Sequence, residues 1–383
     1  MPEAAVPLIA ALELARRLDE GDRVQLLDVR APERVERGRV AFGATLDFRA
    51  LPASAIYGLP TLEPLGLDPA VPVAVICGHG NSSRQVTRHL REHGFEAFSL
   101  AGGMVAWEAV YLSRPLTPTP RLDHLIQVDR VGKGALSYVL VSDGDAIVVD
   151  PGRHLEPYEA LLGRLGATPA AVVDTHMHAD YLSGARAAAV RWEVPYFLHP
   201  DDARSPYDDT RGRLAYEPLT DGDTLAVGRA TVSAVHLPGH TLGSVALVVD
   251  GAVALTGDCL FVQSVGRPDL GGQGAAWAPK LWESLERVRR LWSGDMLVLP
   301  AHYASETERR ADRSVAARVD VIAATNEAAA IRDRVAFLAW VEAHAVAPPE
   351  AYRTIKLANL GLVEVAAGDA EVLEFGPNAC AVG

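Results

Sequence analysis

The chain has 383 residues, of which 49% are hydrophobic and 22% charged, and its formal net charge at pH 7 is −13. This length and composition predict a globular protein of two or three domains with sizeable cores. The acidic charge argues against binding to nucleic acid or to anionic membranes, and no apolar run reaches the roughly 18–20 residues of a membrane span. Cys77, Cys259 and Cys380 are too few and too scattered for a disulfide framework. Because residues 1–21 do not read as a signal peptide, we expect a cytoplasmic protein.

The first chemical motif lies where a short apolar strand, residues 73–77, ends on Cys77. A glycine-containing loop follows, and a helical pattern then runs from Gln85 to His93. Backbone N–H groups in such a loop, together with the helix dipole, stabilise an anion and lower the pKa of a thiol. We therefore predict that Cys77 is a nucleophile, with a buried structural cysteine as the alternative. The loop residues expected to bind its substrate are Gly78, His79, Gly80, Asn81 and Ser82.

The surroundings of Cys77 resemble a rhodanese domain. The resemblance rests on LLDVR (residues 26–30), the loop after Cys77 and LAGGMVAW (residues 100–107), and it spans about residues 5–113. It implies that Cys77 accepts sulfane sulfur and exchanges it between thiosulfate and thiols. Ser82 stands where the family often has arginine, which leaves the substrate preference open and makes an inactive docking domain the alternative.

A proline-rich stretch, Ser113–Arg121, follows this region. Its prolines favour an extended, semi-rigid linker. We therefore expect one domain over residues 1–114, a linker over residues 115–123 and a second domain over residues 124–383.

The most informative motif of the second domain is THMHAD, residues 175–180, directly after the apolar strand 170–174. Side chains alternate along an extended chain, so His176, His178 and Asp180 can face one point. Two imidazoles and a carboxylate at a strand end suit zinc or non-haem iron. Three polar residues in a surface loop are the alternative.

Three later strand ends supply further candidate ligands. His240 closes a Pro-Gly turn that follows a strand, and Asp258 and His302 each follow an apolar run. Rigid strands fix ligand positions better than loops do. A single histidine at a strand end is usually structural, whereas four such sites in order favour a metal centre.

These motifs resemble those of the metallo-β-lactamase superfamily, over roughly residues 124–310. The matching phrases, in order, are HMHADY (176–181), HLPGHTLGS (236–244), LTGDCLF (255–261) and LPAHY (299–303). The resemblance implies a four-layer αββα sandwich with the metal at one edge of its two sheets. The predicted fold class is therefore α/β, with an N-terminal rhodanese-like α/β domain followed by a metallo-β-lactamase αββα sandwich with C-terminal helices.

Tyr181 departs from the superfamily's usual motif, which has a histidine for the second metal at this position. The departure favours one metal, with a phenolate ligand from Tyr181 left open. Among single-metal members the chain resembles the persulfide dioxygenases, although these usually keep that histidine. The resemblance implies a mononuclear Fe(II), with zinc as the alternative, held by His176, His240 and Asp258. Such a triad leaves three coordination positions for sulfur and oxygen.

Further site residues follow from the same resemblance. His178 and His302 are expected close to the metal, where His178 would orient water or substrate. Asp180 and Tyr181 are expected to take part in catalysis.

The segment GRPDL, residues 266–270, resembles the G-R-x-D segment of persulfide dioxygenases. It implies that Arg267, next to Asp269, binds a carboxylate of a glutathione-like substrate through its bidentate fork. The alternative is a proline-containing loop in which Arg267 and Asp269 pair with each other.

The segment after the motifs, residues 305–342, has apolar residues at helical spacing, and Tyr352–Leu360 predicts one more helix. We expect these helices to cover the sandwich, and a homodimer interface is left open.

The sequence predicts a persulfide dioxygenase–rhodanese fusion. It would oxidise glutathione persulfide, or a similar low-molecular-weight persulfide, with O2 to sulfite and thiol. The rhodanese domain would transfer sulfane sulfur at Cys77, with thiosulfate and sulfite as its small-molecule partners. One alternative is a zinc hydrolase of the glyoxalase II type that cleaves a glutathione thioester and carries a sulfur-relay rhodanese domain. A second alternative is a non-catalytic sulfur-relay or binding module.

Overall fold

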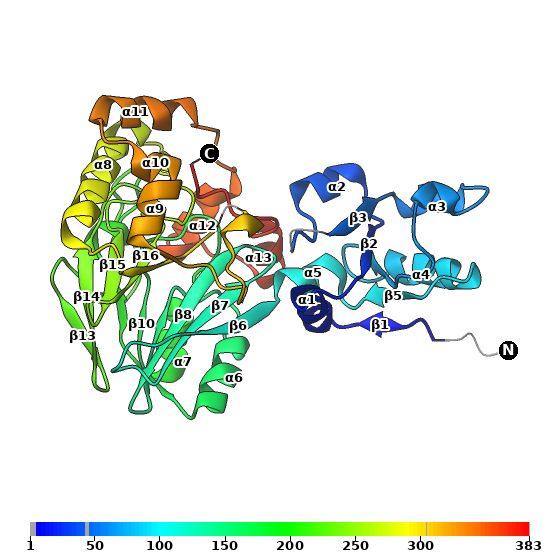
Figure 1. Cartoon of the computed structure of the whole chain (residues 1–383), viewed down its shortest axis with the longest axis horizontal. Coiled ribbons are helices and arrows are strands. Elements are labelled where there is room, and N and C mark those ends of the chain that lie inside the picture. The colour runs from blue at the N-terminus through cyan, green and yellow to red at the C-terminus, as the bar shows by residue number, and fades with distance from the viewer. Residues whose placement is uncertain (1–4, 43–45, 304, 383) are drawn as a thin grey trace. The chain divides into compact units, whose positions relative to one another are not determined.

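The computed structural model describes residues 5–42, 46–303 and 305–382, and it separates into two compact units (Figure 1). The first unit takes the described residues up to Leu112 together with Arg130–Lys133 and Phe375–Pro377. The second unit takes the remaining described residues. Within these ranges, no helix combines the length and the apolar character needed to cross a membrane.

The first unit is built on a five-stranded parallel sheet with the order β1-β5-β4-β2-β3. Its elements are β1 (Leu8–Ile9), α1 (Ala11–Asp19), β2 (Gln25–Asp28), α2 (Pro32–Arg37), β3 (Asp47–Ala50), α3 (Ala53–Tyr57), the 3-10 turn Glu63–Leu65, β4 (Val73–Ile76), α4 (Ser82–Glu92), β5 (Ala97–Leu100) and α5 (Gly103–Glu108). Alternate residues of β4 enter different cores, because Ala74 faces Trp107 of α5 and Val75 faces Val86 of α4. A parallel sheet covered by helices on both faces explains why β4 is apolar throughout.

The second unit contains two sheets, with the orders β12-β11-β10-β9-β8-β7-β6 and β13-β14-β15-β16-β17-β18. The strands of the seven-stranded sheet are β6 (Tyr111–Leu116), β7 (His124–Arg130), β8 (Ala135–Ser142), β9 (Asp145–Val149), β10 (Thr168–Val173), β11 (Tyr196–Leu198) and β12 (Glu217–Pro218). Those of the six-stranded sheet are β13 (Thr224–Val227), β14 (Ala230–His236), β15 (Val245–Val249), β16 (Val253–Gly257), β17 (Leu297–Pro300) and β18 (Ala317–Arg318). The helices are α6 (Glu156–Leu165), α7 (Ala185–Trp192), α8 (Gly274–Leu291), α9 (Val319–Thr325), α10 (Glu327–Ala330), α11 (Arg334–Ala343), α12 (Ala351–Asn359) and α13 (Ala367–Leu373), with 3-10 turns at Pro200–Ala203 and Glu306–Glu308.

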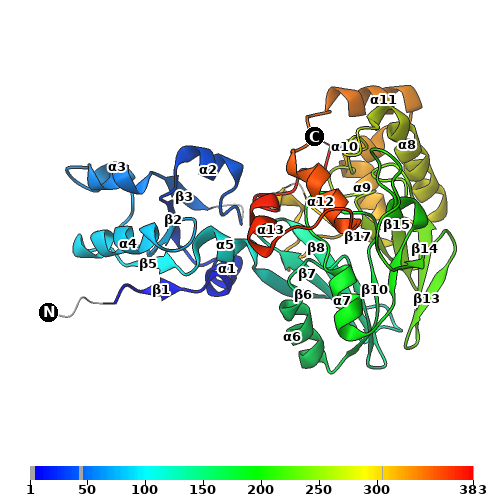
Figure 2. The same cartoon turned by 180° about the vertical axis from the view of Figure 1, so that it is seen from behind.

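The two sheets pack face to face around a common apolar core. Leu255 of β16 and Ile147 of β9 belong to this core, whereas Ala254 points to the opposite face and packs with Leu281 of α8. Helix α7 covers the outer face of the other sheet, where Ala188 packs with Val172 (Figure 2). The layers therefore run helix, sheet, sheet, helix, as the sequence predicts.

Strand β6 continues to Leu116, at the start of the expected linker. One expectation about local structure is wrong. Residues 305–318 are not helical as a whole, because β18 pairs antiparallel with β17 and the first α-helix of this region begins at Val319. The physical reason is tertiary: Val315 is buried between the sheets, and its N–H donates to the side chain of Gln127 at 2.9 Å. The helix expected at Tyr352–Leu360 is confirmed as α12.

Candidate metal centre and cysteine loop

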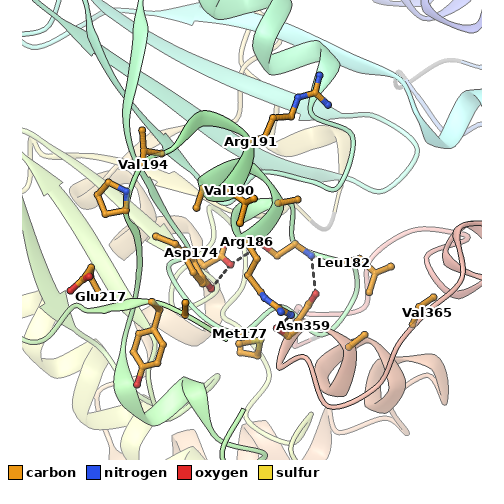
Figure 3. Close-up of a pocket in the computed structure, with 18 of the residues that line it drawn as sticks. Asp174, Met177, Leu182, Arg186, Val190, Arg191, Val194, Glu217, Asn359 and Val365 are labelled. Atoms are coloured by element: carbon orange, nitrogen blue, oxygen red, sulfur yellow. Dashed lines mark hydrogen bonds between the residues drawn. The ribbon is translucent and has the colours of Figure 1, made fainter. Parts of the chain in front are cut away.

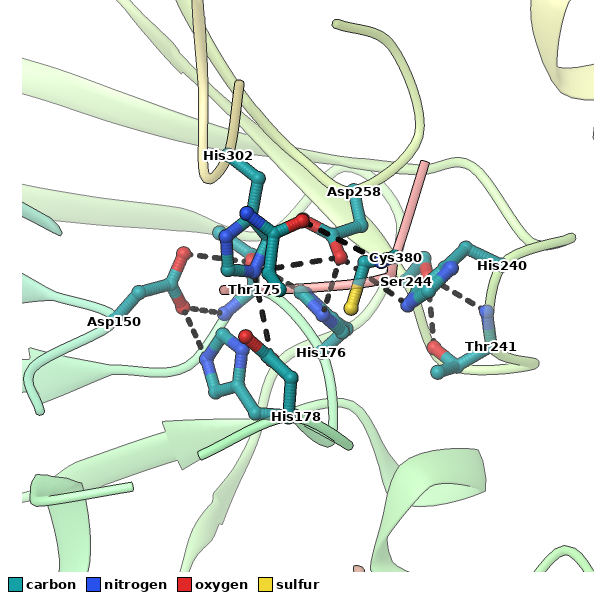
Figure 4. Close-up of polar contacts among 12 residues, drawn as sticks. Asp150, Thr175, His176, His178, His240, Thr241, Ser244, Asp258, His302 and Cys380 are labelled. Atoms are coloured by element: carbon teal, nitrogen blue, oxygen red, sulfur yellow. Dashed lines mark hydrogen bonds and ion pairs between the residues drawn. The ribbon is translucent and has the colours of Figure 1, made fainter. Parts of the chain in front are cut away.

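Four side chains meet where strands of both sheets end. His176 follows β10, His240 follows the turn after β14, Asp258 directly follows β16, and His302 lies two residues after β17. All four are fully buried. Asp258 is the common neighbour, because its Oδ2 lies 3.4 Å from His240 Nε2, 3.6 Å from His176 Nε2 and 3.7 Å from His302 Nε2 (Figure 4).

The atoms that face this point are unsatisfied. In the part of the chain that the structure describes, the Nε2 atoms of His176, His240 and His302 and both carboxylate oxygens of Asp258 have no hydrogen-bond partner. Buried polar groups in native proteins are almost always paired. One ligand atom each from His176, His240 and Asp258 lies within 4.8 Å of the others. These donors suit a divalent metal with imidazole and carboxylate ligands.

The charges of the centre fit the same chemistry. Burial lowers the pKa of His240 to about 3, although Asp258 acts in the opposite direction. Burial would raise the pKa of Asp258, but His302, His176 and His240 outweigh it and hold this pKa well below its usual range. Metal ligands must be deprotonated, so an ionised carboxylate beside a neutral imidazole is ready to bind.

The opposite ring nitrogens are held by oxygen atoms. His176 Nδ1 lies 3.0 Å from Thr175 Oγ1, which itself donates to Asp150 Oδ2 at 2.8 Å. His240 Nδ1 lies 2.9 Å from the carbonyl oxygen of Arg267, and His302 Nδ1 lies 3.0 Å from that of Gly134. Such partners keep the proton on Nδ1 and turn the lone pair of Nε2 toward the metal point.

Replacing Thr175 by valine keeps the shape of the side chain and removes the oxygen that orients His176. We expect the metal affinity to fall about 10- to 100-fold, the usual effect of losing such a partner. Competition with a chromogenic chelator measures this affinity. The matched control is Thr241→Val, because the Thr241 hydroxyl donates to the Asp202 carboxylate. An unchanged affinity in Thr175→Val would show that its hydroxyl does not position the ligand.

His178 and Tyr181 form a pair beside the centre. Their rings stack with centroids 4.3 Å apart, and the Tyr181 hydroxyl lies 3.0 Å from His178 Nε2 and donates to the carbonyl oxygen of Asp150 at 3.2 Å. His178 Nε2 also lies 3.2 Å from Asp150 Oδ1, whereas its buried Nδ1 has no hydrogen-bond partner among the described residues. Burial, followed by the charge of Asp150, raises the pKa of Tyr181 well above its usual value, which favours a neutral phenol. Tyr181 therefore supports His178 in this arrangement.

Asp180 also lies beside the centre, with its Oδ1 3.5 Å from His302 Nε2. Asp180 and His302 form a second group of potential ligands together with Cys380, and all three are fully buried. No motif of the sequence includes Cys380, which lies more than 70 positions after His302.

Arg267 and Asp269 form a bidentate pair, with distances of 2.7 and 2.6 Å. The Arg267 guanidinium also donates to the carbonyl oxygens of Val346 and Ala379. This is the Arg–Asp pair that the sequence left as the alternative. To hold a substrate carboxylate, Arg267 would have to exchange Asp269 for it, and its role in substrate binding stays a prediction.

A cavity of about 870 Å³ lies beside α7 (Figure 3). Asp174 lines this cavity and places its Oδ1 3.7 Å from His178 Nε2. Met177, Arg186 and Asn359 also contribute to its wall. No sequence pattern predicted this cavity, because α7 and α12 meet there from distant parts of the chain.

In the first unit, Cys77 ends β4 and its thiol lies inside the loop that leads into α4. Sγ accepts a hydrogen bond from the Gly80 N–H at 3.1 Å and lies 3.2 Å from Ser83 Oγ. The loop is tied to α5, since the N–H of Met104 donates to the Cys77 carbonyl at 2.9 Å. Of the predicted loop residues, Gly78, His79, Gly80 and Asn81 precede the helix, and Ser82 is its first residue.

Burial would raise the pKa of the Cys77 thiol, but hydrogen bonds from Ser83, His79 and Gly80 outweigh it and lower this pKa. Burial raises the pKa of Cys259 to about 12. Because the thiolate is the reactive form, alkylation of Cys77 by iodoacetamide should reach half its maximal rate at a lower pH than for a free cysteine. Peptide mass spectrometry across a pH series measures this, with Cys259 as the internal control that stays unmodified. A half-maximal pH at or above about 8.5 for Cys77 would contradict the loop's effect.

Models of two known families match the chain. The metallo-beta-lactamase superfamily model matches residues 130–325, and the rhodanese-like domain model matches residues 10–110. The chain is 37% identical over 190 residues to the uncharacterized protein ML0493 of Mycobacterium leprae, which covers 43% of this chain and 85% of that protein. It is 34% identical over 164 residues to a hydroxyacylglutathione hydrolase of Xanthomonas euvesicatoria, which covers 43% of this chain and 58% of the relative.

Two solved structures share the architecture. A metallo-beta-lactamase from Staphylococcus aureus superposes with a TM-score of 0.55 at 24% identity, covering 61% of this chain and 71% of that one. ETHE1 from Myxococcus xanthus superposes with a TM-score of 0.52 at 22% identity, covering 65% of this chain and 98% of that one. At these identities the likeness shows the fold alone. Together with the family models it confirms the predicted fold class.

Proposed function

The chain belongs to the metallo-beta-lactamase superfamily and carries a rhodanese-like domain ahead of the family region, and on this premise we propose that it is a persulfide dioxygenase joined to a sulfurtransferase. The observation that carries the proposal is the buried group of His176, His240 and Asp258, whose facing atoms lack partners. Two imidazoles and one carboxylate are the ligand set of non-haem iron oxygenases. Tyr181, at the position of a second-metal histidine, favours a mononuclear iron there over a two-zinc hydrolase.

The proposed reaction consumes one low-molecular-weight persulfide, such as glutathione persulfide, one O2 and one water, and it yields one thiol and one sulfite. The terminal sulfur loses four electrons, which O2 accepts. Ferrous iron held by the triad would supply open positions for the sulfur and for O2. The burial of the triad excludes bulk water. His178 Nδ1, buried and without a partner among the described residues, would orient substrate or the reacting water.

In the rhodanese-like domain, Cys77 would carry sulfane sulfur between thiosulfate and a thiol. The Gly80 N–H and the Ser83 hydroxyl at its sulfur support this proposal, because they stabilise the attacking thiolate. Attack on the sulfane sulfur of thiosulfate would form a persulfide on Cys77 and release sulfite.

A second candidate is a zinc hydrolase that cleaves a glutathione thioester. The 34% identity to the hydroxyacylglutathione hydrolase of Xanthomonas euvesicatoria favours it. That match leaves 42% of the relative uncovered, since it spans 58% of its length. The departure at Tyr181 counts against this candidate. The remaining alternative is a non-catalytic module. A module of that kind needs no metal, so it does not explain why so many ligand-type atoms are buried without hydrogen-bond partners.

The deciding experiment measures O2 consumption by anaerobically purified, iron-loaded protein after addition of glutathione persulfide. We expect rapid uptake with sulfite formation, and neither in Asp258→Ala. The zinc-loaded protein is tested in parallel with a hydroxyacyl glutathione thioester. Thioester cleavage by the zinc form, without O2 uptake by the iron form, would replace the dioxygenase with the hydrolase.

Replacing Cys77 by serine separates the two proposed activities. We expect sulfur transfer from thiosulfate to cyanide to fall to background, because serine offers no thiolate, while O2 uptake with glutathione persulfide persists. Both assays on the same preparation serve as each other's control. Residual sulfur transfer in Cys77→Ser would assign the acceptor role to another thiol.

A further inference from the structure

The cavity of about 870 Å³ beside α7 has no part in the proposed function. Its volume is that of a small-molecule site, since such pockets usually measure about 300–1,000 Å³. Its wall comes from three stretches of the second unit, residues 174–196, 215–217 and 358–365, and most of the lining residues are apolar. The cavity is therefore large enough and apolar enough to hold a ligand of its own.

Two apolar side chains of this wall are exposed to solvent. Val190 of α7 is 81% exposed, and Val363, which follows α12, is 39% exposed. A single exposed valine is normal on a protein surface, but these two come from distant parts of the chain and line the same cavity. An apolar part of a ligand would remove both from water.

Two of the four charged residues in the wall are already engaged. The Asp174 carboxylate is buried and accepts hydrogen bonds from the hydroxyls of Ser183 and Tyr196, at 2.7 and 2.9 Å. Arg191 forms an ion pair with Glu159 at 2.6 Å. Neither of these charges is left for a ligand.

Arg186 is the charged residue that stays available. Its half-buried guanidinium forms no ion pair with any residue that the structure describes, and it donates only to the carbonyl oxygens of Asn359 at 3.5 Å and Arg213 at 3.3 Å. A guanidinium has five N–H donors, so donors remain for a ligand. Glu217, the fourth charged residue, is exposed on β12 and stands apart from Arg186 in Figure 3. A ligand in the cavity would thus meet a positive charge.

The wall is held in shape before a ligand binds. Asn359 Nδ2 donates to the carbonyl oxygens of His178 and Tyr181, at 3.0 and 2.9 Å. Its Oδ1 accepts a hydrogen bond from the Ser183 N–H at 2.9 Å. These bonds fix the end of α12 against the segment that leads into α7. Binding to a preformed wall loses little free energy to ordering.

We propose that this cavity binds a small amphipathic carboxylate, a molecule with one carboxylate group and a short saturated chain. The carboxylate would pair with the guanidinium of Arg186, whose geometry suits two parallel N–H···O bonds. The chain would lie on Val190, Val194 and Val363. This site goes beyond the proposed function. Its ligand binding is measured without substrate or O2, so a failure of either proposal leaves the other standing.

The test is isothermal titration calorimetry of the full-length protein with octanoate. We expect saturable binding of one equivalent with a negative heat-capacity change, because apolar surface is buried. Octanamide has the same chain without the charge and should bind about 10- to 100-fold more weakly, since it loses a charge-assisted hydrogen bond. Acetate has the charge without the chain and should not bind at the same concentrations.

Replacing Arg186 by methionine removes the charge and keeps a side chain of similar length. We expect the affinity for octanoate to fall by about 10- to 100-fold, to that of octanamide. The matched control is Arg191→Met, because Arg191 lines the same cavity but is already paired with Glu159. This control should bind octanoate as the wild type does.

Val190→Glu covers the case in which Arg186→Met does not fold, because a side chain that is 81% exposed can be changed without disturbing the core. Its carboxylate would repel the ligand, so octanoate should bind more weakly. Val335→Glu is its control, since Val335 is 76% exposed on α11 and does not line the cavity. Equal affinity of the wild type for octanoate and octanamide, or no saturable binding of octanoate, would overturn the proposal. So would wild-type affinity in Arg186→Met or in Val190→Glu.

Discussion

Replacing Asp258 by alanine should empty the metal centre and reduce O2 uptake to background. Asp258 Oδ2 lies within 3.7 Å of three imidazoles, so this carboxylate is the neighbour that His176, His240 and His302 share. Without it, two imidazoles remain where the proposed iron needs a carboxylate as well. Metal content of the purified variant, followed by O2 uptake after iron loading, measures the loss.

The matched control is Asp201→Ala. Asp201 belongs to another histidine–carboxylate group, with His199 and His236, but its side chain is exposed. We expect this control to keep its metal and its activity. Circular dichroism of both variants checks that the fold is intact. Normal iron content in a folded Asp258→Ala would remove this residue from the ligand set.

Replacing Gly266 by alanine should damage the same centre without altering a ligand. A Cβ at this position would lie 1.7 Å from the Asp258 carbonyl oxygen and 2.9 Å from His240 Nδ1. Both neighbours belong to ligand residues, so the backbone at position 266 has to move away from Asp258 and His240. Overpacking a core costs about 1–3 kcal/mol, and each kcal/mol lowers the melting temperature of a domain of 150–250 residues by about 2–4 °C. We expect such a decrease together with weaker metal binding.

Differential scanning calorimetry with and without metal measures both effects. Gly163→Ala in α6 is the control, because nothing lies within 4 Å of a Cβ placed there and alanine suits a helix better than glycine. Its melting temperature should stay the same or rise. If Gly266→Ala behaves like this control, the loop after Asp258 accommodates a Cβ at position 266, and the expected clash is wrong.

The metal triad could be predicted because each ligand follows a strand that is apolar in the sequence. The apolar runs of β10 and β16 place His176 and Asp258 at strand ends, and the turn before His240 is marked by Pro-Gly. These are local patterns, readable without knowing how the strands pair. The family resemblance then supplied their order and the sandwich.

The groups that orient the ligands could not be predicted in the same way. His240 and His302 are held by carbonyl oxygens of Arg267 and Gly134, and every residue type offers a carbonyl. Their selection depends on how β8 and the loop after β16 approach the histidines. Cys380 was missed for a related reason, since its place depends on a bridge between Ala381 and Gly266, more than 100 residues apart.

Ligands that come from both sheets have a consequence for the stability of the fold. His176 follows a strand of the seven-stranded sheet, whereas His240 and Asp258 follow strands of the six-stranded one. A bound ion would therefore act as a cross-link that fastens one half of the sandwich to the other. Its binding free energy adds to the free energy of folding, by about 2.7 kcal/mol when free metal is 100-fold above its Kd. Without the metal the two halves of the sandwich would separate more readily, and the chain would become easier for proteases to cleave.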